Sequence, residues 1–252
     1  MTTTLTCSDG IATVRRTPWD ERVLGYPTAE ILNLQSTTIA GAEAVLSLIE
    51  DWARAEDVGY MNGRFTDDRN IRAALERCGY MNVETTLDMA GKPPITLPRV
   101  PTKLAVTLER MAESDVPLAQ KIALDSFHHG RLLEDPAIPE VAARQRTANW
   151  VADLASQGLA LGAHASGRMV GFHCENVEAD NAALILTGVR EDDSAFALPL
   201  WCAVLESLRS RGVKRITAPV SAANTGVINV YSTLGFKVHR TWFGFRKMLA
   251  RA

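Results

Sequence analysis

The chain has 252 residues, of which 46% are hydrophobic and 22% charged, and its formal net charge is −2. This length can bury one large core or two small ones, and the near-neutral charge gives no overall basic excess for binding nucleic acid. The sequence has no basic segment followed by an apolar run at its start, and no apolar stretch reaches the roughly 18 to 20 residues of a spanning helix. We therefore expect no association with a membrane.

The cysteines give no sign of a metal or redox site. They are widely spread and form no Cys-x-x-Cys pair, so neither a zinc site nor a redox pair is expected. Reduced thiols are the usual state in the cytoplasm, which is the expected location of the protein. The four residues are Cys7, Cys78, Cys174 and Cys202.

Prolines mark the clearest change in composition along the chain. Residues 91–101 contain four prolines, which favour an extended connector. We therefore divide the chain near residue 95 into an N-terminal module (1–95) and a larger C-terminal domain (96–252). Before this connector, hydrophobic periodicity predicts a helix over 42–55, a strand over 60–64, a helix over 70–78 and a strand over 82–89.

After the connector, the patterns predict a mixed α/β domain. Alternating or apolar runs separated by polar turns indicate strands, and longer amphipathic runs indicate helices. In chain order these are a strand at 104–108, helices at 115–126 and 139–156, strands at 160–165, 169–177 and 182–189, a helix at 196–211, a strand at 215–218, a helix at 225–233 and a strand at 237–247.

The helix at 225–233 carries the most specific motif. Asn224 is a good N-cap, and Tyr231 lies two turns later on nearly the same face. Gly235 ends the helix just before Phe236. The motif and the order β-α-α-β-β-β-α-β-α-β over residues 102–250 resemble the GCN5-related N-acetyltransferase (GNAT) family, which has a mixed central sheet flanked by helices. Without that resemblance, Tyr231 would be a tyrosine that packs on a strand.

The resemblance implies acyl transfer from acetyl-CoA or another acyl-CoA to the primary amine of a small molecule, by direct attack in a ternary complex. By the same resemblance, the Tyr231 hydroxyl protonates the departing thiolate and Asn224 contacts the pantetheine or its surroundings. The general base is expected on the strand at 169–177. Alternation places Glu175, the first candidate, and His173, the second, on one face of that strand. An acid that faces solvent is the alternative for Glu175.

The loop before the helix at 196–211 departs from the family pattern. In the family it has Gln or Arg, two residues, Gly, one residue and then Gly or Ala, and its backbone amides receive the pyrophosphate. Here Ser194 replaces the Gln or Arg, and Ala197 and Pro199 replace the glycines. Pro199 has no amide hydrogen, and Asp192 and Asp193 add negative charge. The expected cofactor-binding residues are Asn224 and, in this loop, Val189, Ser194, Ala195, Phe196, Ala197 and Leu198.

Some features of this loop would still permit binding. Ser194 can cap a helix, and Pro199 is tolerated in the first helical turn. Positive charge could come from Arg190, Arg209 or Arg211. If these do not compensate, the protein has kept the fold, lost thioester chemistry and acts as a ligand-binding or partner-binding protein.

The N-terminal module points to a branch of the family. A partial module joined to a GNAT domain is similar to the TDP-fucosamine acetyltransferase branch, which acetylates a nucleotide-linked amino sugar. Trp19 and Asp20, in Pro-Trp-Asp-Glu, and the loop from Phe127 to Arg131 resemble that branch and are expected to bind substrate. Arg131 could bind the diphosphate or the sugar by paired hydrogen bonds, or form a surface salt bridge. His128 and His129 in this loop could accept a proton or lie in a solvated turn.

Residues 70–80 weakly repeat the motif near the C-terminus. A helix from Asn70 runs into Gly79 and Tyr80 before a strand, as the helix after Asn224 runs into Gly235 and Phe236. Leu75 stands where Tyr231 would stand, so this copy lacks the acid and would be structural; a coincidence of two similar junctions is the alternative. As partners we expect a small-molecule amine and no nucleic acid, and a homodimer is possible.

Overall fold

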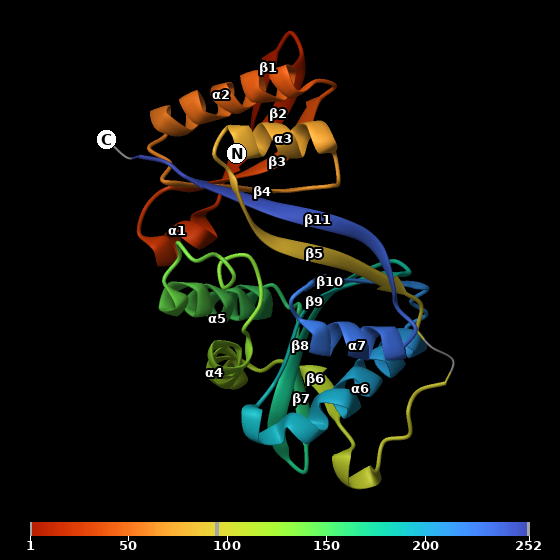
Figure 1. Ribbon diagram of the computed structural model, residues 1–252. Helices are drawn as coiled ribbons and strands as arrows, with labels where there is room; N and C mark the ends of the chain where they lie inside the picture. The colour runs from red at the N-terminus through yellow and green to blue at the C-terminus, as the bar shows by residue number, and fades with distance from the viewer. Residues whose placement is uncertain (1, 94–95, 251–252) are drawn as a thin grey trace. The chain divides into compact units, whose positions relative to one another are not determined.

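The computed structural model describes residues 2–93 and 96–250 (Figure 1). Its described residues form two compact units. Unit 1 comprises Met1–Thr86, Gly130–Ala142 and Arg240–Ala252, and unit 2 comprises Leu87–His129 and Ala143–His239. The expected division at residue 95 lies outside the described residues. The units are not continuous in sequence, as the modules 1–95 and 96–252 would be, because Gly130–Ala142 and the C-terminal segment belong to unit 1. The strands β5 (Met81–Gly91) and β11 (Lys237–Met248) each have residues in both units.

Unit 1 contains a mostly antiparallel sheet with the strand order β1-β2-β3-β4-β11-β5. The pairs β1–β2, β2–β3 and β4–β11 are antiparallel, whereas β3 and β4 run parallel over four residues, from Thr28 opposite Tyr60 to Ile31 opposite Gly63. The helices α2 and α3 lie side by side against the first strands (Figure 1). The other elements are β1 (Thr2–Cys7), β2 (Gly10–Arg16), α1 (Pro18–Leu24), β3 (Thr28–Ser36), α2 (Ile39–Ala55), β4 (Tyr60–Phe65) and α3 (Arg69–Arg77).

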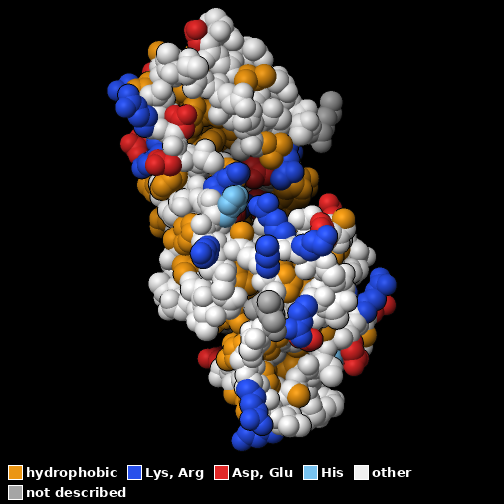
Figure 2. Space-filling model, turned by 90° about the vertical axis from the view of Figure 1, so that its right-hand side faces the viewer, with side chains coloured by type: hydrophobic (Ala, Val, Ile, Leu, Met, Phe, Trp, Pro, Cys, Tyr) orange, Lys and Arg blue, Asp and Glu red, His pale blue; other side chains and the backbone are white. Residues whose placement is uncertain are grey.

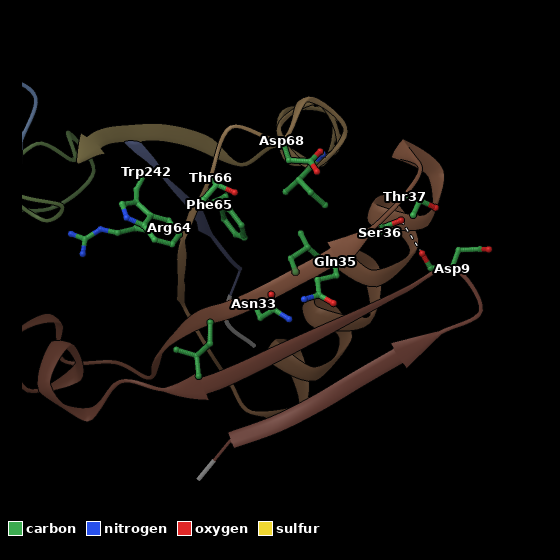
Figure 3. Close-up of a pocket in the computed structure, with 13 residues that line it drawn as sticks. Asp9, Asn33, Gln35, Ser36, Thr37, Arg64, Phe65, Thr66, Asp68 and Trp242 are labelled. Carbon is green, nitrogen blue, oxygen red and sulfur yellow. Dashed lines mark hydrogen bonds between the residues drawn. The ribbon is translucent and has the colours of Figure 1, made fainter. Parts of the chain in front are cut away.

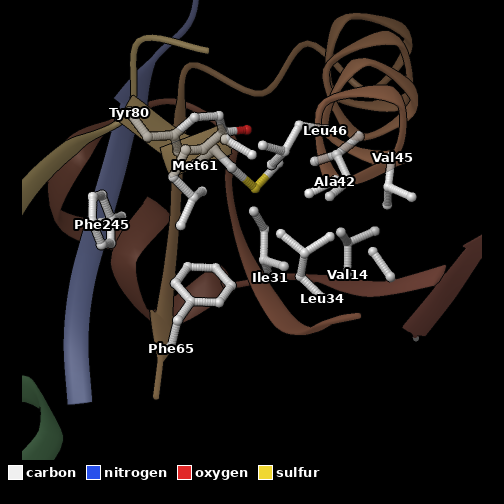
Figure 4. Packing of buried hydrophobic residues seen from close by; sticks show 14 of the residues in the cluster. Val14, Ile31, Leu34, Ala42, Val45, Leu46, Met61, Phe65, Tyr80 and Phe245 are labelled. Carbon is white, nitrogen blue, oxygen red and sulfur yellow. The ribbon is translucent and has the colours of Figure 1, made fainter. Parts of the chain in front are cut away.

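Local signals explain where the helices of unit 1 begin. The Thr38 side chain accepts a hydrogen bond from the Gly41 amide, and the Asp68 carboxylate accepts from the amides of Asn70 and Ile71. The apolar face of α2 then packs on side chains of β2 and β3, as Figure 4 shows. The labelled core residues are Val14, Ile31, Leu34, Ala42, Val45, Leu46, Met61, Phe65, Tyr80 and Phe245.

Unit 2 has the strand order β10-β9-β8-β7-β6. Its two helix layers pack on opposite faces: Phe172 and Cys174 of β8 join the core of α4 and α5, whereas α6 and α7 share a core with β9 and β10. The elements are β6 (Thr107–Arg110), α4 (Val116–Ser126), α5 (Glu140–Ser156), β7 (Ala160–Ala165), β8 (Arg168–Glu178), β9 (Asn181–Val189), η3 (Glu191–Phe196), α6 (Ala197–Ser210), β10 (Arg215–Ser221) and α7 (Thr225–Thr233).

Most predicted elements are present within a few residues, and two differences have physical causes. No element was predicted before residue 42, where the structure has β1, β2, α1 and β3. Threonines and arginines interrupt the apolar alternation there, so these strands depend on pairing with each other. The strand expected at 104–108 was wrong in its first half, where Pro101 leads into a 3-10 turn over Thr102–Leu104 and the strand starts at Thr107.

The predicted repeat of the C-terminal motif is visible in the backbone. The order β3-α2-β4-α3-β5 in the first part of the chain corresponds to β9-α6-β10-α7-β11 in the second. The Tyr80 amide donates to the Leu75 carbonyl at 2.8 Å, and the Phe236 amide donates to the Tyr231 carbonyl at 2.9 Å. Gly79 and Gly235 have positive φ angles of 79° and 85° at these two junctions. Leu75, which corresponds to Tyr231, is buried in the core.

Close backbone packing between β8 and β9 gives a first prediction. A Cβ atom on Gly171 would lie 2.5 Å from the Gly188 carbonyl oxygen, whereas the nearest heavy atom to one on Gly226 would be 3.8 Å away. We expect Gly171→Ala to lower the free energy of unfolding by about 1 to 3 kcal/mol. Gly226→Ala, in α7, should leave it unchanged or raise it by up to about 1 kcal/mol. Urea unfolding of both variants measures this, and equal effects would contradict the packing argument.

Charges of both signs are distributed over the surface. On the face in Figure 2, Lys and Arg side chains lie among Asp, Glu and uncharged side chains, in keeping with a formal net charge of −2. No helix within residues 2–93 and 96–250 is long and apolar enough to cross a membrane.

Candidate active site

Asn224 and Tyr231 take the positions in α7 that the motif predicts. The Asn224 side chain accepts a hydrogen bond from the Val227 amide at 3.2 Å, so it caps the helix. Tyr231 lies on the last turn and is only 5% exposed. The cap fixes the start of α7, and the left-handed Gly235 fixes its end. Together they set the face on which Tyr231 lies.

Aromatic side chains hold the Tyr231 ring in place. Its centroid lies 5.1 Å from Trp201 in an edge-to-face arrangement and 5.3 Å from Phe236. Within the described residues the hydroxyl makes no protein hydrogen bond. Burial raises the pKa of Tyr231 well above its usual range, so the hydroxyl remains protonated at neutral pH. Tyr231 can therefore donate a hydrogen bond to an incoming group.

A chain of polar side chains also contacts Trp201, through His173. The His173 ring, fully buried, packs edge-to-face on Trp201 with centroids 6.1 Å apart. Its Nδ1 lies 2.8 Å from Thr187 Oγ1, and its Nε2 lies 3.1 Å from Glu175 Oε2. The other Glu175 oxygen accepts from Arg211. As alternation predicted, His173 and Glu175 share a face, although the strand pairing shifts between Cys174 and Glu175.

The partners of Glu175 set its protonation state. Burial would raise its pKa, but the hydrogen bond and charge of His173, and then those of Arg211, outweigh burial and hold the pKa of Glu175 below its usual value. A carboxylate with a lowered pKa and both oxygens bonded is a weak proton acceptor. Glu175 is instead placed to orient the His173 ring through its contact with Nε2. The Thr187 hydroxyl bonds to the other ring nitrogen, Nδ1.

The lowered pKa of Glu175 predicts how stability depends on pH. Because its pKa falls on folding, Glu175 stabilises the fold fully above its unfolded pKa of about 4.3, and this contribution is lost as the pH falls through the lower folded pKa. The difference in free energy of unfolding between wild type and Glu175→Gln should therefore be constant above about pH 5 and shrink below it. Denaturant titrations from neutral to acidic pH measure this, and a difference independent of pH would exclude the ion pair.

The loop between β9 and α6 differs from both the family pattern and the expectation of free acidic charge. Asp192 is exposed, but Asp193 is buried and accepts two hydrogen bonds from Arg168, at 2.5 and 2.6 Å. Arg190 lies 3.6 Å from the same carboxylate. The hydrogen bonds from Arg168 lower the pKa of Asp193. The negative charge expected at Asp193 is therefore present but balanced by two arginines, of which Arg190 was named from the sequence and Arg168 was not.

The start of α6 offers few free amides. The helix begins at Ala197 after a 3-10 turn, and Phe196 precedes it without a side-chain cap, so Ser194 does not cap this helix. The Ala197 amide donates to the Ser194 carbonyl. Pro199 is the third residue of α6, in the first turn, as the sequence allowed. Of the predicted cofactor-binding residues in this loop, Ser194, Ala195 and Leu198 are exposed, and Val189, Phe196 and Ala197 are half-buried.

Predicted substrate residues of the N-terminal part lie in unit 1. Arg131 Nη2 donates to Asp20 Oδ2 at 2.6 Å, and the Asp20 side chain is fully buried. The charge of Asp20, opposing the effect of burial, raises the pKa of Arg131. The salt bridge considered for Arg131 is thus present, but inside the unit instead of on its surface. Trp19 is half-buried, with the Arg15 guanidinium 5.1 Å from its ring centroid.

The two histidines of the same loop belong to unit 2. His128 is exposed, and its Nδ1 lies 3.1 Å from Arg144 Nη2. A guanidinium only donates hydrogen bonds, so this nitrogen is the acceptor. His129 is half-buried. Within the described residues, no group of three or more His, Cys, Asp or Glu side chains could hold a metal ion.

Of the predicted residues, the structure groups Tyr231, His173 and Glu175 around Trp201 in unit 2, and Asp20 with Arg131 in unit 1. Two members of the first group, Trp201 and Thr187, were absent from the predictions. Trp201 follows the apolar pattern of α6 and so resembles a core residue. Thr187 reaches His173 only through the β8–β9 register, which a single sequence does not reveal.

Comparison with solved structures identifies the fold. No family model matches the chain, and no curated protein sequence matches it. The mixed sheet flanked by helices is nevertheless that of the GCN5-related N-acetyltransferases, which confirms the predicted fold class. The chain is similar to a GCN5-related N-acetyltransferase from Sphaerobacter thermophilus, with 15% identity and a TM-score of 0.67 over 95% of this chain and 80% of that one.

Two further structures are similar over nearly the whole chain. A tandem GNAT protein from the clavulanic acid biosynthesis pathway is 14% identical, with a TM-score of 0.64 over 97% of this chain and 80% of that one. A glucosamine N-acetyltransferase region of a fungal multi-domain GH3 β-N-acetylglucosaminidase is 13% identical, with a TM-score of 0.65 over 94% of this chain and 31% of that one. These likenesses define the fold of both parts of the chain.

Proposed function

We propose that the protein is an N-acyltransferase that moves an acetyl or other acyl group from acyl-CoA to the primary amine of a small molecule. The observation that carries this proposal is the packing of Tyr231 and His173 on Trp201, at 5.1 and 6.1 Å. It brings a candidate leaving-group donor and a candidate base to the same helix-covered side of the sheet, in a fold whose members generally use acyl-CoA.

In this mechanism the amine attacks the thioester carbonyl while both substrates are held together, and proximity supplies much of the acceleration. Tyr231 donates a hydrogen bond to the departing thiolate. Because its raised pKa makes full proton transfer unfavourable, the donated hydrogen bond is the main stabilising effect.

A relay could remove the amine proton. His173 donates from Nε2 to Glu175, which leaves Nδ1 to accept from the Thr187 hydroxyl. Thr187 is half-buried and His173 is fully buried, so Thr187 is the member of this chain that an amine or a water can reach. Glu175 would then stabilise the protonated His173, and Arg211 keeps Glu175 ionised.

We also propose an amino sugar, free or nucleotide-linked, as the acceptor. The support is the likeness to a structure described as a glucosamine N-acetyltransferase region. The division into an N-terminal GNAT-like module and a C-terminal acyltransferase domain, a cytoplasmic location and a homodimer are further parts of this proposal.

Calorimetric titration with acetyl-CoA, with free CoA as the comparison, tests the proposal first. We expect micromolar binding of acetyl-CoA, followed by acetylation of amino sugars in a mass-spectrometric assay. Arg168→Ala serves as a loop variant, because it frees the Asp193 carboxylate next to the start of α6 and should weaken binding. Lys121→Ala, in an exposed pair on α4, is the control.

The second candidate function is a ligand-binding or partner-binding protein without thioester chemistry. The start of α6 favours it, because Pro199 has no amide hydrogen and the Ala197 amide is already bonded. Absence of acetyl-CoA binding up to millimolar concentrations would support this function and contradict the acyltransferase.

A further inference from the structure

Unit 1 contains a pocket of about 650 Å³ whose lining residues all belong to that unit (Figure 3). Small-molecule sites have volumes of roughly 300 to 1,000 Å³. The pocket lies where β3 and β4 stop pairing: their last pair is Ile31 opposite Gly63, but β3 continues to Ser36. Tyr231 and the residues around Trp201 take no part in it.

One part of the lining is apolar and aromatic. Phe65 and Trp242 lie at one end of the pocket in Figure 3, and Asp9 lies at the other. Leu32, also in the lining, is 40% exposed. An indole and an exposed leucine offer a surface on which the apolar face of a ring can pack.

Another part of the lining offers paired donors and acceptors. Asn33 and Gln35 are exposed on β3, and each carries an amide that both donates and accepts. Beyond Ile31, the side of β3 that faces β4 has no strand partner among the described residues, so main-chain groups are also available there. A ligand with closely spaced hydroxyl groups fits such a surface, because each hydroxyl can donate and accept.

The charges of the lining exclude an anionic ligand. Asp9 and Asp68 contribute two exposed carboxylates. Arg64 is the basic residue among those lining the pocket, and its Nε already donates to the buried Glu84 at 2.8 Å. A phosphate would meet two carboxylates and a guanidinium whose charge is already paired with Glu84 through Nε. An ammonium group would instead be attracted by the two carboxylates.

We propose that this pocket binds a small polyhydroxylated amine of the amino-sugar class. The ring would pack on Trp242 and Leu32, hydroxyl groups would bond to Asn33 and Gln35, and the ammonium group would face Asp68. Binding needs no acyl donor and does not depend on the acyl transfer proposed for unit 2.

Four sugars with the same ring test the proposal by calorimetric titration of the full chain without acyl-CoA: glucosamine, N-acetylglucosamine, glucose and glucose 6-phosphate. We expect glucosamine to bind about fivefold more tightly than the two neutral sugars, which is the effect of one partly exposed charge pair. Glucose 6-phosphate should bind most weakly. Tighter binding of glucose 6-phosphate, equal binding of all four, or no glucosamine binding at millimolar concentrations would overturn the proposal.

Matched variants locate the site. Asp68→Asn removes the charge but keeps a good N-cap for α3, so it should cost about fivefold in glucosamine affinity and remove the preference over glucose. Asp67→Asn, at the next position and outside the lining, should change nothing. Trp242→Ala should weaken binding of all the sugars, and Trp242→Tyr should retain most of it.

If Asp68→Asn and Trp242→Ala leave glucosamine affinity unchanged, the sugar binds elsewhere and the proposal fails. Glucosamine binding to this pocket can be tested separately from acyl transfer. Tyr231→Phe should leave glucosamine affinity unchanged, whether or not the variant still transfers an acyl group.

Discussion

Replacing Tyr231 by Phe is expected to lower kcat for acyl transfer by about 100-fold or more, the usual size of losing one hydrogen-bond donor to the charge that develops in the transition state. The Kd for acetyl-CoA should stay the same. The hydroxyl makes no hydrogen bond with the described protein residues, while the ring packs on Trp201 and Phe236 and would be retained in Phe. We therefore expect the free energy of unfolding to change by less than about 0.5 kcal/mol. Steady-state kinetics and urea unfolding of the same preparation measure the two effects.

Tyr80→Phe is the matched control for this change. The Tyr80 hydroxyl is buried and lacks a hydrogen-bond partner among the described residues, and it lies in unit 1. Its removal should leave kcat unchanged and stability equal or slightly higher. Because burial raises the pKa of Tyr231, wild-type kcat should show no loss from tyrosine deprotonation up to about pH 10. Unchanged turnover in Tyr231→Phe would remove the hydroxyl from the mechanism and leave Tyr231 as a packing residue.

Local signals explain which parts of the site were predictable. The bounds of α7 were predicted correctly, because a good N-cap at Asn224 and a left-handed Gly235 are both encoded within a few residues. The common face of His173 and Glu175 follows from the two-residue period of a strand, even across the register shift. These features need no knowledge of distant parts of the chain.

Features that depend on distant residues could not be predicted. The neutralisation of Asp193 requires Arg168, which is 25 positions earlier on another strand. The contact of Thr187 with His173 requires the pairing of β8 with β9. The strands before residue 42 show only weak alternation of apolar and polar residues, and they depend on hydrogen bonding to neighbouring strands. These contacts depend on which strands pair and in which register, and the whole fold determines both. Residue types and local spacing do not specify them.

Removing the guanidinium of Arg131 is expected to be strongly destabilising. In Arg131→Met the buried Asp20 carboxylate would lose its partner at 2.6 Å, and breaking a buried ion pair in this way costs about 3 to 5 kcal/mol. The loss corresponds to a lower Tm by roughly 6 to 20 °C for a chain of this size. Adding Asp20→Asn removes the buried charge that has lost Arg131 and should recover much of the loss. Thermal and urea unfolding of the two single variants and the double variant measure the coupling between the residues.

The same experiment separates the structural role of Arg131 from the predicted role in binding a phosphate or a sugar. Lys121→Met, which breaks an exposed pair with Asp125, is the control and should cost less than about 0.5 kcal/mol. A stable Arg131→Met protein with weakened affinity for a nucleotide-linked amino sugar would assign Arg131 to the substrate. A destabilised protein that Asp20→Asn rescues would assign it to unit 1, where Tyr60 and Asp135 lie in the same buried network. Because Asp20 is fully buried and already bonded to Arg131, we expect the second result.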